Sequence, residues 1–214
     1  MEVIDFEAYL DHSQRLLFSS LNSPKEIQDF LDSIPYSAEN CNRSPLSVMR
    51  DRQAHCLDGA LFAAAAMRRL GYPPILVDLL PDPGTDDDHV LAIYKVNGCY
   101  GALAKSNYSG LRYREAVYRP LRELVMSYFE DFFNINGQKT LRAYSVSLRL
   151  SRMDGANWMW SDAGADAVEE RLSKLRRIPL ITPQMATGLS AVDPLSFQAG
   201  MLGVNEAGLY KPQV

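Results

Sequence analysis

The hydrophobic pattern is clearest in the stretch that begins at Cys56 and ends near Gly71. Leucine and alanine side chains recur there near one face of a helix, and the alanine run 63–66 has the best intrinsic helix propensity. Two arginines precede Gly71 and suit the negative end of the helix dipole, and this glycine can take the left-handed conformation that ends a helix. The pattern predicts a buried helix with a cysteine in its first turn.

The next apolar runs have the character of strands. The run 74–80 is apolar and stops at a Pro-Asp-Pro-Gly turn, which predicts a buried strand. A second strand is expected from His89 to Val96, and the pair Asn97-Gly98 is typical of a two-residue hairpin turn. The chain should then return along a third strand, from Cys99 to about residue 107.

The flanking segments predict further helices around this core. The expected elements are two N-terminal helices, the second opened by the capping box Ser23–Glu26, an amphipathic helix through 121–132 that ends before Gly137, a strand over 144–150, a helix opened by the capping pair Asp166 and Glu169, and an irregular tail from residue 178. The combination predicts an α+β fold, in which the central helix packs on an antiparallel sheet.

Length and composition are those of one globular domain. A chain of 214 residues can bury about 70% of its unfolded surface without a disulfide or a metal. We expect a single domain over 1–214, divided into N-terminal helices (1–44), a catalytic core (45–110), a helix-strand-helix completion (111–177) and an irregular tail (178–214).

The charge and the cysteine content indicate which classes of partner and which cellular compartment to expect. The net charge is −4 with acids and bases interspersed, so we expect neither a nucleic-acid partner nor a membrane surface. The stretch 1–7 is acidic where a secretory signal would be basic. Three cysteines, an odd number without metal-ligand spacing, suit a reducing cytoplasm and leave thiols free for chemistry.

Cys56 is the candidate nucleophile. The first turn of a helix offers unpaired backbone N–H groups and the positive end of the dipole, both of which stabilise a thiolate. A buried cysteine that only fills space is the alternative interpretation. A zinc site built from His55, Cys56, Asp58 and His89 is disfavoured, because neighbouring helix residues cannot all converge on one ion.

A nucleophilic thiol needs a base, and the base needs a group that orients it. His55 adjoins Cys56 but should point elsewhere, so His89, at the start of a strand, is the better base. A two-residue turn places Ser106 opposite His89, whereas a register shifted by one residue brings Asn107 there. Asn107 has the better orienting chemistry, since its carbonyl oxygen can accept from the imidazole N–H.

The order of helix-borne cysteine, strand-borne histidine and polar residue on the next strand resembles the transglutaminase-like branch of the papain-like superfamily. Over about 45–110, the resemblance is carried by Cys56 with Gly59-Ala60, Gly71-Tyr72, Asp88-His89-Val90 and Gly98-Cys99-Tyr100. It implies a papain-like core. An asparagine at the third site is similar to the Cys-His-Asn arrangement of papain-like proteases.

These residues predict acyl transfer from an amide in a peptide, a protein or a small molecule. The Cys56 thiolate would form a thioester with His89 as general base, and the acyl group would then pass to water or an amine. The Cys56 backbone N–H would hold the oxyanion, with Gln53 as a possible side-chain donor. No cofactor and no metal are expected. The rival hypothesis is a binding module of the same fold without turnover.

Overall fold

The structure is a computed structural model that describes residues 6–212, so most of the acidic stretch 1–7 lies outside it. The fold is α+β, with one sheet in the strand order β4-β3-β2-β1-β5-β7 and with β6 also paired to β1. The elements are α2 (His12–Ser20), α3 (Pro24–Ser33), α4 (Pro45–Asp51), α5 (Cys56–Arg69), β1 (Ile75–Pro81), β2 (His89–Val96), β3 (Cys99–Leu103), η1 (Ser109–Leu111), β4 (Arg114–Tyr118), α6 (Leu121–Met126), β5 (Leu141–Ser145), β6 (Leu148–Arg149), η2 (Leu150–Ala156), α7 (Asp162–Ser173), β7 (Arg177–Pro179), α8 (Pro183–Thr187), α9 (Pro194–Gly200) and η3 (Glu206–Gly208).

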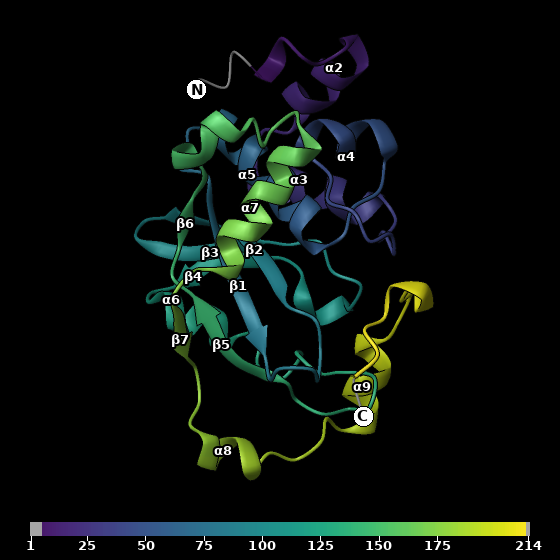
Figure 1. The fold of residues 1–214 in the computed structure, drawn as a ribbon, viewed down its shortest axis with the longest axis vertical. Helices are drawn as coiled ribbons and strands as arrows, with labels where there is room; N and C mark the ends of the chain where they lie inside the picture. The colour runs from purple at the N-terminus through teal and green to yellow at the C-terminus, as the bar shows by residue number, and fades with distance from the viewer. Residues whose placement is uncertain (1–5, 213–214) are drawn as a thin grey trace.

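Two groups of helices flank the sheet. Helices α2, α3, α4, α5 and α7 gather at one end of the molecule, and α8 and α9 lie at the other (Figure 1). All the strand pairings are antiparallel. The predicted α+β class is therefore confirmed, with a cysteine-bearing helix on an antiparallel sheet and further helices at both ends.

The β2–β3 hairpin forms as predicted. Asn97 and Gly98 both have positive φ, 51° and 81°, which is the conformation of a type I′ turn. Val96 pairs with Cys99, and the register runs on to the pair Ala92 and Leu103. The ladder ends at Leu103, about four residues earlier than expected, because the chain then leaves β3 for a buried non-strand segment.

Helix α5 is buried along nearly its whole length, from Cys56 to Met67. Its core includes Val90, Ala92 and Tyr94 of β2, whereas Leu91 and Ile93 belong to a second core on the opposite face of the sheet. Side chains alternate between the faces of a strand. By this alternation His89 shares the face of Leu91, away from α5.

Two of the predicted helices have different bounds. The predicted helix over 121–132 is wrong beyond Met126, where α6 ends. Ser127 Oγ donates to Leu124 O (2.6 Å) and Ser127 O accepts from Arg114 (3.0 Å), so side chains satisfy carbonyl groups that the next helical turn would use. The capping pair Asp166 and Glu169 does not open α7, which begins four residues earlier at Asp162.

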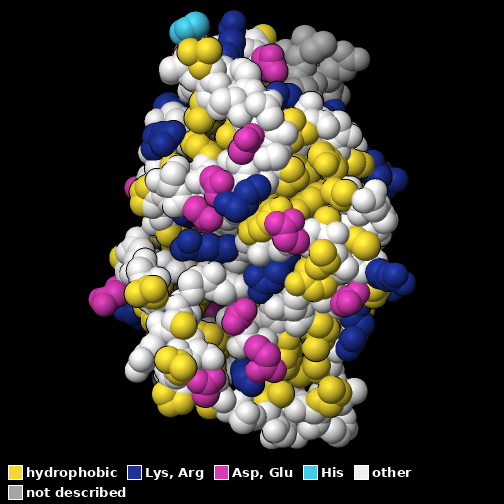
Figure 2. Space-filling view, turned by 180° about the vertical axis from the view of Figure 1, so that it is seen from behind, with side chains coloured by type: hydrophobic (Ala, Val, Ile, Leu, Met, Phe, Trp, Pro, Cys, Tyr) yellow, Lys and Arg dark blue, Asp and Glu magenta, His cyan; other side chains and the backbone are white. Residues whose placement is uncertain are grey.

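The strand predicted over 144–150 is broken into β5 and β6, and both pair with β1. Among the α-helices and strands, five were not predicted from the sequence: α4, β4, β7, α8 and α9. The prediction of an irregular tail from residue 178 is therefore wrong at α8 and α9, which each begin with a proline after a side-chain cap from Thr182 or Asp193. Figure 2 shows acidic and basic side chains interspersed among apolar ones over the face seen from behind. No helix within 6–212 has the length and apolar character needed to span a membrane.

Gly59→Ala should destabilise the protein by about 1–3 kcal/mol, the usual effect of overpacking a core. A Cβ at Gly59 would overlap the Lys105 side chain and lie 3.4 Å from the Lys105 Cα. Alanine gains about 1 kcal/mol in helix propensity over glycine, which is too little to offset that overlap. Urea unfolding measures the difference, with Gly155→Ala as control because nothing lies within 4 Å of its added Cβ. A gain in stability for Gly59→Ala would contradict the packing argument.

Candidate functional site

Cys56 is the first residue of α5, as predicted. The residue before it, His55, has extended backbone angles and caps the helix: its Nδ1 accepts from the Leu57 backbone N–H at 3.2 Å. Asp58 completes a capping box, because its carboxylate accepts from the His55 backbone N–H at 3.1 Å. The helix start is thus defined by side-chain caps, and the Cys56 side chain is 8% exposed.

Asp58 ties the loop before α4 to this helix start. Its side chain is fully buried and accepts from the Arg43 backbone N–H at 2.6 Å. Arg43 is itself buried, with its Nη1 3.8 Å from Asp58 Oδ2 and 3.1 Å from the Ser37 hydroxyl. His55 Nε2 lies 3.2 Å from both Asp58 Oδ1 and the Cys41 carbonyl oxygen. Sequence reasoning missed the structural role of Asp58 and Arg43.

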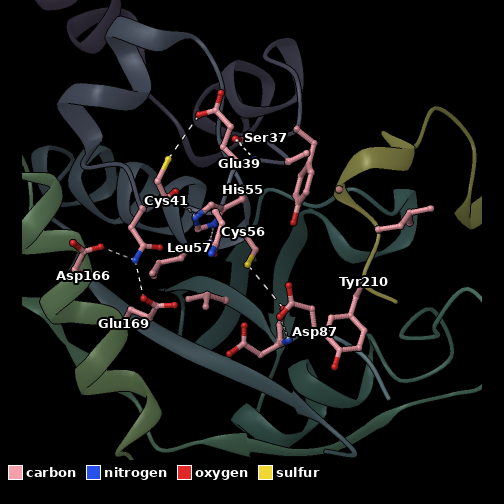
Figure 3. Close-up of a pocket in the computed structure, with 18 of the residues that line it drawn as sticks. Ser37, Glu39, Cys41, His55, Cys56, Leu57, Asp87, Asp166, Glu169 and Tyr210 are labelled. Carbon is pink, nitrogen blue, oxygen red and sulfur yellow. Dashed lines mark hydrogen bonds between the residues drawn. The ribbon is translucent and has the colours of Figure 1, made fainter. Parts of the chain in front are cut away.

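A cavity of about 550 Å³ opens beside Cys56. Its walls come from the loop 36–42, the start of α5, the loop before β2, helix α7 and the tail segment 207–210. Figure 3 shows the Cys56 thiol facing the side of Asp87, with Tyr210 of the tail beyond it. Three aspartates, 86–88, precede His89 in the sequence, and two of them, Asp87 and Asp88, line the cavity.

The surroundings of Cys56 favour a neutral thiol. Its Sγ lies 3.9 Å from the backbone carbonyl oxygen of Asp88, a distance at which the S–H can donate. Burial, and after it the negative charges of Asp88 and Asp87, raise the pKa of the Cys56 thiol well above its ordinary value. A hydrogen bond from the Val90 backbone N–H lowers this pKa, but burial is the largest cause and the pKa rises.

His89 lies on the other face of the sheet from Cys56. Its Nε2 is 2.7 Å from the backbone carbonyl oxygen of Leu111, which can only accept, so Nε2 carries the proton. Leu111 belongs to the second core, not to the core around α5. Burial lowers the pKa of His89 to about 4, so the ring is neutral at pH 7. Among the described residues, the imidazole makes no hydrogen bond to the Cys56 thiol.

Ser106 and Asn107 are both buried, and both border a small cavity of about 40 Å³ that His89 also lines. Their hydrogen bonds go elsewhere. Ser106 Oγ accepts from the Tyr108 backbone N–H at 3.0 Å. The Asn107 amide pairs with the Asn205 backbone: Nδ2 donates to Asn205 O (2.9 Å), and Oδ1 accepts from Asn205 N (2.8 Å). We predicted that Asn107 orients His89, but both polar atoms of the Asn107 side chain are bonded to Asn205 instead.

Gln53 is half-buried, and its side chain is hydrogen-bonded to Glu39. The described lining of the Cys56 cavity does not include it. Within residues 6–212, no three His, Cys, Asp or Glu side chains are placed to hold one metal ion. Cys56 lines the larger cavity, whereas His89, Ser106 and Asn107 line the smaller one. The two cavities adjoin, because both are lined by Tyr36, Asp87, Asp88, Gly208 and Tyr210.

Comparison with known proteins adds little to this geometry. No protein-family model matches the chain, and no curated protein matches it. Among solved structures, Legionella pneumophila LapG overlaps 56% of this chain and 78% of its own, with 14% sequence identity and a TM-score of 0.39. The EGTA-treated form of LapG overlaps 56% and 77%, with the same identity and TM-score. A likeness of this size does not decide function, so the residues of this chain must.

Proposed function

We propose that this chain is a binding module that holds a ligand in the Cys56 cavity without forming a thioester on Cys56. The observation that carries the proposal is the position of His89, hydrogen-bonded to Leu111 on the far face of the sheet. A general base must lie within hydrogen-bond reach of the proton that it takes, directly or through one water. His89 makes no hydrogen bond to the Cys56 thiol, and its Nε2 proton is held by Leu111.

His55 does not replace it. Its Nδ1 lone pair accepts from the Leu57 backbone N–H, so Nδ1 is unavailable as a base while the helix cap is intact. Its Nε2 therefore bears the proton and points to the Cys41 carbonyl oxygen and Asp58. The raised pKa of the Cys56 thiol also disfavours a thioester on Cys56, because a thiol that stays protonated is a poor nucleophile.

The ligand that we propose is a peptide, a protein segment or a small amide. The cavity is large enough for several residues, and residues 207–210 already form one of its walls. A wall made by a stretch of the chain itself supports a polypeptide ligand. The lining is predominantly polar, which suits a ligand with hydrogen-bonding groups.

Thiol-dependent acyl transfer is the second candidate function. The observation in its favour is that Cys56 lines the cavity at the first turn of a 14-residue helix, where the backbone N–H groups could hold an oxyanion. This function requires His89 to leave Leu111 and reach the opposite face of the sheet. The two functions predict opposite reactivities for Cys56.

Iodoacetamide should modify Cys41 at least about tenfold faster than Cys56, since each unit by which a thiol pKa rises removes nine-tenths of the thiolate at neutral pH. Cys41 is exposed, and burial and the charge of Glu39 also raise its pKa, but the pKa of the buried Cys56 thiol is raised well above its ordinary value. A time course at pH 7.5, read by peptide mapping, gives both rates, and the urea-unfolded chain supplies the intrinsic rates.

His89→Gln should leave the slow rate at Cys56 unchanged, because the imidazole does not contact the thiol. Asn107→Ala and Ser106→Ala test the predicted orienting group in the same assay. If Cys56 is the fastest of the three cysteines and His89→Gln slows it, the acyl-transfer function replaces the binding function.

A further inference from the structure

The Asn107 side chain binds the backbone of the C-terminal segment at Asn205. The side-chain amide donates to the Asn205 carbonyl oxygen and accepts from the Asn205 N–H, at 2.9 and 2.8 Å. Asn107 is 6% exposed, and both polar atoms of its side chain are used in this pair. A paired amide of this kind binds both backbone polar groups of one residue, here Asn205, which has extended angles and caps the 3-10 helix η3 that follows it.

Tyr36 forms the other side of the groove. Asn205 Nδ2 donates to the Tyr36 carbonyl oxygen at 3.1 Å. Three residues later, Gly208 lies against the Tyr36 ring: an added Cβ would be 3.0 Å from the ring and 3.4 Å from Asn107 Nδ2. The groove between Tyr36 and Asn107 therefore accepts a residue without a side chain at this point. From there the segment continues along the Cys56 cavity to Tyr210 (Figure 3).

The segment that fills the groove is only lightly attached. None of the residues 201–212 is buried, in contrast to α5 and β2. The chain just before it is better anchored, because Phe197 packs on Phe133 with ring centroids 5.5 Å apart and Ser109 Oγ donates to Ala199 O. Segments with little buried apolar surface open at low free energy while the rest of the fold persists. Residues 205–210, which we call the strap, can therefore leave the groove without unfolding the core.

We propose that the groove between Tyr36 and Asn107 is a binding site for a peptide that forms a 3-10 turn with a glycine three residues after the residue paired to Asn107, and that the strap, whose residues 206–208 form the 3-10 helix η3, occupies it as a tethered ligand. The inference rests on the proposed function, in which the adjoining Cys56 cavity binds rather than reacts. A partner peptide displaces the strap and takes over its hydrogen bonds. Tethering gives the strap an effective concentration of about millimolar, so a free peptide at micromolar concentration competes poorly with it.

The test displaces the strap without altering the groove. Gly208→Val in the full chain places a branched side chain against Tyr36, and Gly208 does not have a positive φ that would itself forbid valine. Gly188→Val is the matched control, because its added Cβ meets nothing nearer than 3.7 Å. The probe is a fluorescent peptide with the sequence of residues 203–212, Gly-Val-Asn-Glu-Ala-Gly-Leu-Tyr-Lys-Pro. Hydrogen exchange at the Asn205 amide, followed by NMR, reports whether the strap is in place.

Gly208→Val should lose protection at the Asn205 amide and bind the peptide at least about tenfold more tightly than the wild type or Gly188→Val. Adding Asn107→Ala to Gly208→Val should abolish the gain. A peptide with valine at the position of Gly208 should bind none of these proteins. If Gly208→Val keeps the Asn205 amide protected, the strap is a fixed part of the fold and the inference fails. If protection is lost without tighter peptide binding, the groove is not a peptide site.

The two proposals fail separately. Slow alkylation of Cys56 without peptide binding would overturn the tethered-ligand inference and leave a binding module for another ligand. Fast alkylation of Cys56 would overturn the proposed function, whatever the peptide does.

Discussion

Replacing Asp58 with alanine should destabilise the protein by about 3–5 kcal/mol, the range for breaking a buried charge pair from one side. The carboxylate is fully buried and accepts from the backbone N–H groups of Arg43 and His55. Alanine would leave both donors without this partner and would remove the carboxylate 3.8 Å from the buried Arg43 guanidinium. The helix that carries Cys56 would also lose its capping box.

This loss of stability reports the cost of removing the hydrogen-bond acceptor, not a net stabilisation by the buried negative charge. Burial raises the pKa of Asp58 above its ordinary value, so the folded state bears an energetic penalty for keeping the carboxylate charged. Asp58→Asn should therefore be less destabilising than Asp58→Ala, since its carbonyl oxygen still accepts one backbone hydrogen bond.

Urea unfolding at pH 7 provides the free energies of unfolding. Asp166→Ala is the control: Asp166 is exposed on α7, accepts from the Asn42 side chain, and should change stability by less than about 0.5 kcal/mol. A loss below about 1 kcal/mol for Asp58→Ala would show that Arg43 and His55 find other partners.

Asp78→Asn should stabilise the protein above pH 8, by an amount on the order of 3 kcal/mol. Asp78 is 2% exposed on the α5 side of β1, and its Oδ1 has no hydrogen-bond partner among the described residues. Burial, and after it the charge of Asp88, raise the pKa of Asp78 to about 8. The folded chain therefore binds a proton that the unfolded chain releases near pH 4.

The sign of the effect follows from that difference in proton binding. Between about pH 4 and pH 8 the folded state holds more protons than the unfolded state, so stability falls as the pH rises, by at most about 1.4 kcal/mol per pH unit for one group. The stabilisation by the protonated Asp78 is complete below the unfolded pKa and is lost as the pH passes the folded one. Asparagine does not titrate and removes this dependence.

The free energies of unfolding of wild type and Asp78→Asn should be compared at pH 5 and pH 9. The difference should shift in favour of Asp78→Asn at the higher pH, whereas Asp166→Asn should show no comparable shift. An equal difference at both pH values would mean that Asp78 is already ionised at pH 5.

The sequence by itself determined the elements that depend on local preferences. The alanine-rich run 57–70 predicted α5 and the place of Cys56 in its first turn, because propensity and hydrophobic period agree there. The pair Asn97-Gly98 determined the register of the β2–β3 hairpin, since those residues accept the positive φ that the turn needs. The stripe through 121–132 misled, because packing against Arg114 ended α6 at Met126.

Only the tertiary structure decided which residues meet at the site. Because successive side chains of an extended chain point to opposite faces of the sheet, His89 and Asp88 lie on different sides. The local sequence does not indicate which face α5 covers. The packing of α5 on one face of the sheet places Asp88 beside Cys56, and His89 then forms its hydrogen bond with Leu111 on the other side. The pairing of Asn107 with Asn205 joins residues 98 positions apart, and a contact of that separation arises from the packed fold rather than from any local pattern.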